Sequence, residues 1–314
     1  MRRRLAKPAF AALLLLLLAL GLVGRCSGPE ALDQAAFDAL YATPLPAASG
    51  PRQVYHLGHS LVGHDMPAML AQLAGEGHGY ASQIGWGASL REHWEPDVAV
   101  KGFAEENTHP EHRDPRGALA GGAFDALVLT EAVEIRDSIR YQASADYLAR
   151  WAGAAWDGNP DAQVYLYETW HRLDGEEDWL DRLDGDLTRH WEGQILRVAL
   201  ARQDAPPRAI YVIPAGQVMA AFVRKVEASG GIGPIRARGD LFADEIHLND
   251  YGAYLVALTH FAVLYGRTPQ GLPHALLRAD GTPADDPGPE AARAMQDAVW
   301  AVVQAYPRSG VAAR

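Results

Sequence analysis

The chain is organised around residues 244–254, which read DEIHLNDYGAY and lead into a long apolar run. Asn249 or Asp250 can begin a helix there, because a short side-chain oxygen accepts hydrogen bonds from the free N–H groups of a first helical turn. Asp244 and His247 then lie on the loop before that helix. At this spacing the acid can hold one ring nitrogen of the histidine and leave the other free to act as a base.

A nucleophile for such a base occurs near the other end of the chain. Residues 53–57 read QVYHL, a short apolar run typical of a buried strand, and GHSL follows at 58–61. A tight turn directly after a strand is where catalytic serine nucleophiles are commonly exposed, and Ser60 has this position in the sequence. Taken alone, a Gly-x-Ser sequence more often marks an ordinary turn. With the late acid and base present, we predict Ser60 as nucleophile, His247 as base and Asp244 as orienting acid.

Together these stretches resemble the SGNH (GDSL-like) hydrolase family over residues 54–266. That family carries its nucleophile in an early Gly-Asp-Ser-Leu block and its acid and base in a late Asp-x-x-His block. The resemblance implies a flavodoxin-like three-layer fold and a serine esterase that needs no cofactor. It also implies three donors to the oxyanion: the Ser60 N–H, a glycine after the second strand, here Gly85 with Gly87 as the second choice, and an asparagine in a third block.

The third block departs from the family pattern. Residues 129–132 read LTEA where the family has Gly-x-Asn-Asp. An ionised Glu131 cannot donate a hydrogen bond and would repel an oxyanion. Either Glu131 is turned away and Thr130 donates in its place, or Glu131 accepts from a substrate hydroxyl or pairs with Arg136.

Tryptophans near other predicted strand ends allow two interpretations. Glu168 and Trp170 follow an apolar run on the active side, where an indole can stack on a sugar ring and a carboxylate can accept from sugar hydroxyls. Both residues can equally be packing residues of the core. Trp86 and Trp94 allow the same two interpretations.

Strand-like and helix-like segments alternate along the chain. Apolar strand-like runs occur at residues 53–57, 80–85, 124–129, 162–167 and 208–213. Helical patterns separate and follow them. This alternation predicts an α/β fold, a three-layer α/β/α sandwich around a parallel five-stranded sheet. Ligand sites in such sheets lie beyond the carboxyl ends of the strands, where the candidate residues fall.

The chain divides into four predicted segments. Residues 1–26 join a basic start to a leucine-rich run, which predicts a signal peptide or an N-terminal anchor, and hence an exported, periplasmic or secreted protein. Cys26, the single cysteine, is either a lipid attachment site or of no consequence. We predict a linker at 27–52, the hydrolase-like domain at 53–270, and a Pro- and Gly-rich linker with a packed C-terminal helix at 271–314.

The charge balance excludes some partner classes. With 39 acidic and 28 basic residues the net charge is −11, whereas nucleic acids and anionic membranes need a basic face. We therefore expect no nucleic acid partner, and membrane contact only through an uncleaved leader. His109 and His112 form only a loose pair, so we expect no metal and no cofactor.

The sequence thus predicts an exported serine esterase. It would hydrolyse an acyl ester, with acetyl favoured, on carbohydrate or another small alcohol, through an acyl-enzyme at Ser60. An O-acyltransferase using the same three residues is one alternative. A non-catalytic glycan-binding module on the same fold is the other.

Overall fold

A computed structural model describes residues 30–313 of the chain. The predicted leader at 1–26, with Cys26, lies outside these residues. From Ala31 onward the described chain forms one compact unit.

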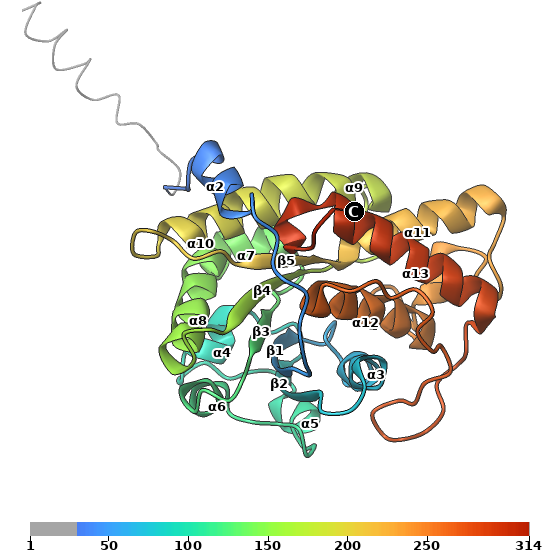
Figure 1. The fold of residues 1–314 in the computed structure, drawn as a ribbon, viewed down its shortest axis with the longest axis horizontal. Helices are drawn as coiled ribbons and strands as arrows, with labels where there is room; N and C mark the ends of the chain where they lie inside the picture. The colour runs from blue at the N-terminus through green and yellow to red at the C-terminus, as the bar shows by residue number, and fades with distance from the viewer. Residues whose placement is uncertain (1–29, 314) are drawn as a thin grey trace, which may run out of the picture. The chain divides into compact units, whose positions relative to one another are not determined.

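Within residues 30–313, five parallel strands form one sheet (Figure 1). The strands are β1 (Gln53–His59), β2 (Gly79–Gly85), β3 (Ala126–Leu129), β4 (Gln163–Glu168) and β5 (Tyr211–Pro214). Their order is β2-β1-β3-β4-β5. β1 is therefore hydrogen-bonded on both edges, and its register ends with His59 opposite Gly85. The predicted α/β class with a parallel five-stranded sheet is confirmed.

Helices cover both faces of this sheet, because its strands are apolar on both sides. On β1, Val54 belongs to one core and Tyr55 and Leu57 belong to the other. The first face carries α3 (Asp65–Ala74), α11 (Ala215–Ser229), α12 (Asp250–Tyr265) and α13 (Gly288–Ala305). The second carries α4 (Leu90–Trp94), α8 (Ser144–Gly158), the π-helical segment η1 (Leu187–Leu196) and α10 (Arg197–Ala201).

Helix α12 lies against the sheet at the centre of the first face. Asn249 caps it as predicted, since its side chain accepts from the backbone N–H groups of Tyr251 at 3.0 Å and Gly252 at 3.2 Å. Nearly every residue of the helix is buried, from Asp250 to Tyr265. A helix that is apolar all round belongs inside a protein, and this one fixes the loop that precedes it.

The remaining helices are short or interrupted. They are α2 (Gln34–Leu40), α5 (Phe103–Glu106), α6 (Pro115–Ala120), α7 (Ile135–Tyr141), α9 (Trp179–Asp186), η2 (Arg238–Leu241) and η3 (Pro307–Ser309). Residues 178–202, where apolar residues recur at helical spacing in the sequence, are divided into α9, η1 and α10. None of the helices within residues 30–313 combines the length and apolar composition needed to cross a membrane.

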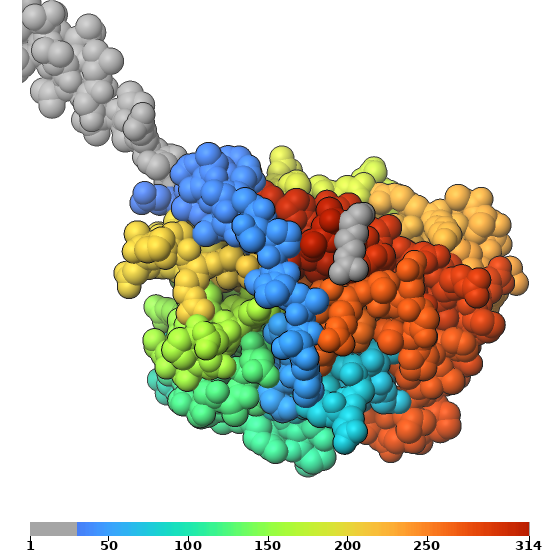
Figure 2. All heavy atoms as spheres, viewed as in Figure 1, coloured from blue at the N-terminus to red at the C-terminus, as the bar shows by residue number. Residues whose placement is uncertain are grey.

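From Ala31 onward, the segment that the sequence predicts as a linker at 27–52 is part of the compact unit and packs against the rest of it. Phe37 and Tyr41 are buried, and the Tyr41 hydroxyl donates to the Ile210 carbonyl at 2.7 Å. Figure 2 shows this segment, in blue, running over the surface between the green and red parts of the chain. It lines a hollow together with Asp125 and Gln163, which lie at the amino ends of β3 and β4. The opposite end of the sheet, with the carboxyl ends of the strands, is left for a site.

Burial of many histidines makes the fold sensitive to acid. Among the described residues, burial lowers the pKa of eight histidines: six are shifted most, with His59, His78, His93, His171 and His260 at about 4 and His56 well below its usual value, and His109 and His112 are lowered as well. Burial raises the pKa of two carboxyls, that of Glu131 to about 7 and that of Glu168 to about 8.

We expect the free energy of unfolding to be greatest near pH 7 and to decrease as the pH falls from 6.5 toward 4. In this range the unfolded chain binds protons at six histidines that the folded chain leaves neutral, and stability then rises with pH. Glu131 and Glu168 act in the opposite sense but are only two groups. Urea unfolding followed by tryptophan fluorescence at pH 7, 6 and 5 measures the change. Equal midpoints at the three pH values would contradict this expectation.

Candidate active site

The structure brings Ser60, His247 and Asp244 together in one hydrogen-bonded chain. Ser60 Oγ lies 3.0 Å from His247 Nε2, and His247 Nδ1 lies 2.7 Å from Asp244 Oδ2. An ionised carboxylate only accepts hydrogen bonds, so Nδ1 carries the proton of the neutral ring and Nε2 accepts from the serine hydroxyl. This is the arrangement in which a histidine can remove the proton of a serine nucleophile.

Asp244 also shapes the loop that carries the histidine. Its Oδ1 accepts from the backbone N–H groups of Ile246 at 2.8 Å and His247 at 2.7 Å. The hydrogen bond from the His247 ring, followed by these two backbone bonds, lowers the pKa of Asp244 to about 2. The side chain is thus ionised over the whole range in which the histidine can act as a base.

An open cleft of about 610 Å³ lies directly over these residues. Ser60 and His247 line it together with Trp86, Gly87, Glu106, Val133 and Ile246, among others. Most of these residues come from the turns that follow β1, β2 and β3 and from the loop before α12, and Glu106 comes from the end of α5. The carboxyl ends of the parallel strands therefore form its floor, where ligand sites in such sheets occur.

Only one of the two candidate oxyanion glycines lines this cleft. Gly87 does, and its φ of +59° is a conformation that favours glycine. Gly85 is the last residue of β2 and is packed inside, since a Cβ added there would lie 2.2 Å from Val100 Cγ1. The geometry thus favours Gly87 over Gly85 as the neighbour of Ser60.

Thr130 and Glu131 both point away from the cleft. The Thr130 hydroxyl is fully buried and donates to the Tyr167 carbonyl at 2.8 Å. Glu131 is also fully buried, and its Oε1 accepts from the backbone N–H groups of Ala132 at 2.7 Å and Leu90 at 3.4 Å. Neither side chain faces Ser60 as a donor or as a charge, and Glu131 does not pair with Arg136, which binds Glu177.

Glu168 and Trp170 are likewise parts of the interior. Glu168 accepts from the backbone N–H of Gly216 at 2.8 Å and from that of Gln217 at 3.3 Å, and so binds the start of α11. Trp170 is 2% exposed, and its indole N–H donates to the Ile246 carbonyl at 2.8 Å. It therefore supports the loop of His247 from behind and presents no face to a sugar.

The exposed tryptophan of the cleft is Trp86. Its side chain is 51% exposed, and its indole N–H donates to Glu106 Oε1 at 2.7 Å. The other oxygen of Glu106 lies 2.9 Å from His64 Nε2. A Cβ added at Gly102 would lie 2.3 Å from the indole ring, so one face of the ring is packed against this glycine. The sequence allowed a substrate role for Trp86 but gave no sign of its pairing with Glu106.

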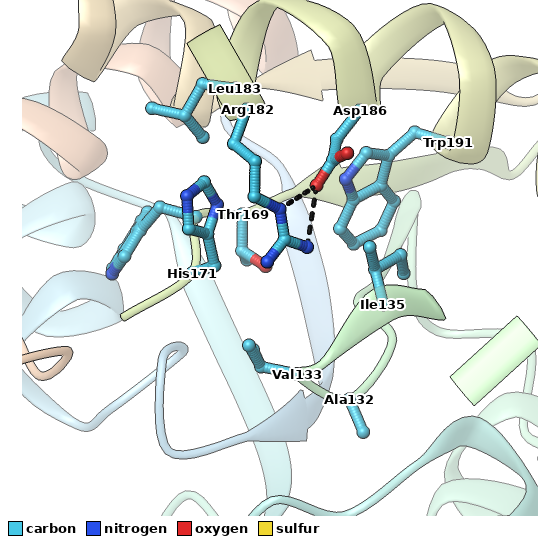
Figure 3. Close-up of a pocket in the computed structure, with 10 residues that line it drawn as sticks. Ala132, Val133, Ile135, Thr169, His171, Arg182, Leu183, Asp186 and Trp191 are labelled. Atoms are coloured by element: carbon cyan, nitrogen blue, oxygen red, sulfur yellow. Dashed lines mark hydrogen bonds and ion pairs between the residues drawn. The ribbon is translucent and has the colours of Figure 1, made fainter. Parts of the chain in front are cut away.

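A second cavity, on the other side of the cleft wall at Val133, measures only about 10 Å³ (Figure 3). Arg182 fills one side of it, bonded to Asp186 at 3.0 Å and to Glu134 at 2.6 Å. Among the described residues, Thr169 Oγ1 and His171 Nε2 have no hydrogen-bond partner. This volume suits a single water molecule rather than a ligand. In the described part of the chain, no three His, Cys, Asp or Glu side chains are placed to hold a metal ion.

Comparisons with known proteins support the fold. No protein-family model matches the chain, and no curated protein matches it. A DUF4886 family protein from Bacteroides uniformis aligns with a TM-score of 0.53 at 18% identity, over 82% of this chain and 96% of that one.

Two further solved structures are of the predicted type. A candidate GDSL-like lipase from Parabacteroides merdae has a TM-score of 0.40 at 14% identity, over 70% of this chain and 99% of that one. A carbohydrate esterase family 3 protein from Talaromyces cellulolyticus has a TM-score of 0.35 at 14% identity, over 68% and 96%. Similarity at these identities concerns the fold and not the activity, and TM-scores below 0.5 support no further conclusion.

Thr130→Val separates a structural role of the hydroxyl from a role in oxyanion binding. Loss of the buried bond to Tyr167 should lower the free energy of unfolding by about 1–3 kcal/mol. Because the hydroxyl faces away from Ser60, we expect kcat/KM for ester hydrolysis to change by less than about twofold, whereas loss of an oxyanion donor costs about a hundredfold or more. Urea unfolding and steady-state kinetics measure the two effects. A hundredfold loss of kcat/KM in the folded variant would contradict this expectation and show that Thr130 takes part in oxyanion binding.

Proposed function

We propose that this protein is a serine esterase that hydrolyses small acyl esters at Ser60. The observation that carries the proposal is the chain of hydrogen bonds from Ser60 through His247 to Asp244, in which Ser60 and His247 line an open cleft. Burial in the core does not explain this arrangement, because all three side chains are partly exposed.

In the proposed reaction Ser60 Oγ attacks the acyl carbonyl while its proton passes to His247 Nε2. The resulting imidazolium is stabilised by Asp244, which stays ionised. The backbone N–H groups of Ser60 and Gly87 are the proposed donors to the oxyanion. His247 then gives its proton to the leaving alkoxide, and the acyl group remains on Ser60. A water, deprotonated by the same ring, then attacks the acyl carbonyl, and the ring returns this proton to Ser60 Oγ as the carboxylic acid leaves.

The open cleft favours hydrolysis over acyl transfer. The His247 side chain is 46% exposed, so water can reach an acyl group on Ser60. A transferase has to exclude water from this intermediate. Residues 1–26 lead us to place the reaction outside the cytoplasm, in the periplasm or in the medium.

For the alcohol part of the ester we propose a sugar, placed on the exposed face of Trp86. The indole is held on one side by Gly102 and at its N–H by Glu106, so its free face is fixed beside Ser60. A rigid aromatic face with a carboxylate at its edge suits a ring that has both C–H faces and hydroxyl groups. This replaces Glu168 and Trp170 as the proposed sugar-binding residues.

Hydrolysis of p-nitrophenyl acetate tests the nucleophile and the base. We expect Ser60→Ala and His247→Ala each to lower kcat by at least about a thousandfold, because the two groups act as a unit. Asp244→Asn should lower kcat by roughly a hundredfold, since the ring loses its fixed tautomer. Circular dichroism of each variant controls for folding. Unchanged activity in folded Ser60→Ala would exclude Ser60 as the nucleophile.

Trp86→Ala tests the sugar platform. With an acetylated oligosaccharide as substrate, KM should rise by about tenfold, which corresponds to about 1.4 kcal/mol of lost binding. The effect on p-nitrophenyl acetate should be smaller, because this ester has no sugar to place on the indole. Tyr141→Ala is the matched control, since Tyr141 is 58% exposed and does not line the cleft. Equal changes of KM for the acetylated oligosaccharide in both variants would show that Trp86 does not bind the sugar.

A further inference from the structure

Glu131 connects the three turns that surround Ser60. Its carboxyl Oε1 accepts from the N–H of Leu90, at the start of α4, and from its neighbour Ala132. Its backbone carbonyl accepts from His59 Nε2 at 2.8 Å, and His59 directly precedes Ser60. The same residue thus holds the turn after β1, the turn with Gly87 after β2, and the start of the turn after β3.

Helix α4 is tied to the nucleophile strand a second time. His93 Nε2 donates to the Gly58 carbonyl at 2.7 Å, and its Nδ1 accepts from Gln83 at 3.0 Å. Burial keeps the pKa of both His59 and His93 at about 4, so both rings are neutral at physiological pH. Neither histidine supplies a positive charge to Glu131.

The second carboxyl oxygen of Glu131 has neither a hydrogen-bond partner nor an ion-pair partner within residues 30–313. Oε2 is fully buried and lacks a hydrogen-bond partner among the described residues. The Ser144 hydroxyl, at the start of α8, is close enough to lower the pKa of Glu131, yet the two groups do not form a hydrogen bond of normal geometry. The charged group that acts on it from α4 is Glu92, which is acidic and raises the pKa further.

A carboxyl in this position is stable when it carries a proton. The protonated Oε2 can donate to Ser144, while Oε1 continues to accept from Leu90 and Ala132. An ionised carboxylate would be a buried charge without a cation, which is costly and drives either neutralisation or a rearrangement of its surroundings. In this case the surroundings are the turns that place Ser60 and Gly87.

We propose that Glu131 is a positioning residue that holds the turns of the active site together as a neutral carboxylic acid, and that its ionisation limits the activity at alkaline pH. This rests on the proposed esterase function. Burial, the largest cause, raises the pKa of Glu131 to about 7, so the change falls within the working range of an enzyme with a histidine base. Because Glu131 touches no substrate, the loss appears in kcat and not in KM.

The test compares pH profiles of the wild type, Glu131→Gln and Glu168→Gln. The amide keeps an acceptor for Leu90 and Ala132 and a donor for Ser144 but cannot ionise. Glu168 is the matched control, since it is also a fully buried carboxyl at a strand end but binds the start of α11. The hydrolysis of p-nitrophenyl acetate is measured from pH 5 to 9, with the rate of Ser60→Ala subtracted.

In the wild type and in Glu168→Gln, kcat should fall above about pH 7, with KM constant within about twofold. Glu131→Gln should keep its activity at pH 6 within about threefold and lose the alkaline fall, so that it exceeds the wild type at pH 9 by about tenfold.

Absence of the alkaline fall in the wild type, or an alkaline fall that Glu131→Gln retains, overturns the role of Glu131 and leaves the esterase function intact. Wild-type activity equal to that of Ser60→Ala shows a different failure. In that case the esterase function itself is excluded, and the role of Glu131 in it falls as well.

Discussion

The structure depends on the position of β1, which is paired on one edge with β2 and on the other with β3. Both faces and both edges of a central parallel strand are covered, so only the residues at its two ends can contribute to an open site. The amino end is covered by residues before Gln53, and the carboxyl end leads into the turn with Ser60. At Gly58, just before this turn, the backbone of β1 comes so close to Thr130, the residue after β3, that an added Cβ would lie 2.4 Å from the Thr130 methyl carbon. The backbone of β1 therefore fixes where the serine is presented.

The histidine reaches this serine from the far end of the chain through a loop with its own supports. Asp244 folds the loop by accepting two of its backbone N–H groups, and Asn249 starts the helix that follows. Trp170 binds the loop from behind at the Ile246 carbonyl. The carboxylate of Asp244 thus has two functions, because the same side chain that orients the ring also shapes the backbone that carries it. This double function explains why the three-residue spacing between acid and base is needed.

Much of this site could be predicted from the sequence because its parts are local. Ser60 follows a recognisable strand, and Asp244, His247 and Asn249 lie within six positions of one another. The roles of the residues at the carboxyl ends of β3 and β4 could not be assigned, because the direction of a side chain at the end of a strand depends on packing that the sequence does not show. Thr130 and Glu168 are committed to interior partners that lie far away in the sequence, at Tyr167 and Gly216. The packing of Trp86 could not be predicted either, because its partners Gly102 and Glu106 lie in residues 101–106, which show no periodic pattern. The burial of Phe37 and Tyr41 could not be predicted either, because the segment around them is rich in alanine and proline and therefore resembles a linker.

Active-site labelling tests the central claim most directly. A fluorophosphonate reacts with a serine only when a nearby base activates it, and peptide mass spectrometry locates the adduct. We predict one adduct per chain, on the peptide with Ser60, formed by the wild type and not by folded His247→Ala. An adduct at another residue, or one that forms equally without His247, would contradict the assignment of Ser60 as the nucleophile and His247 as its base.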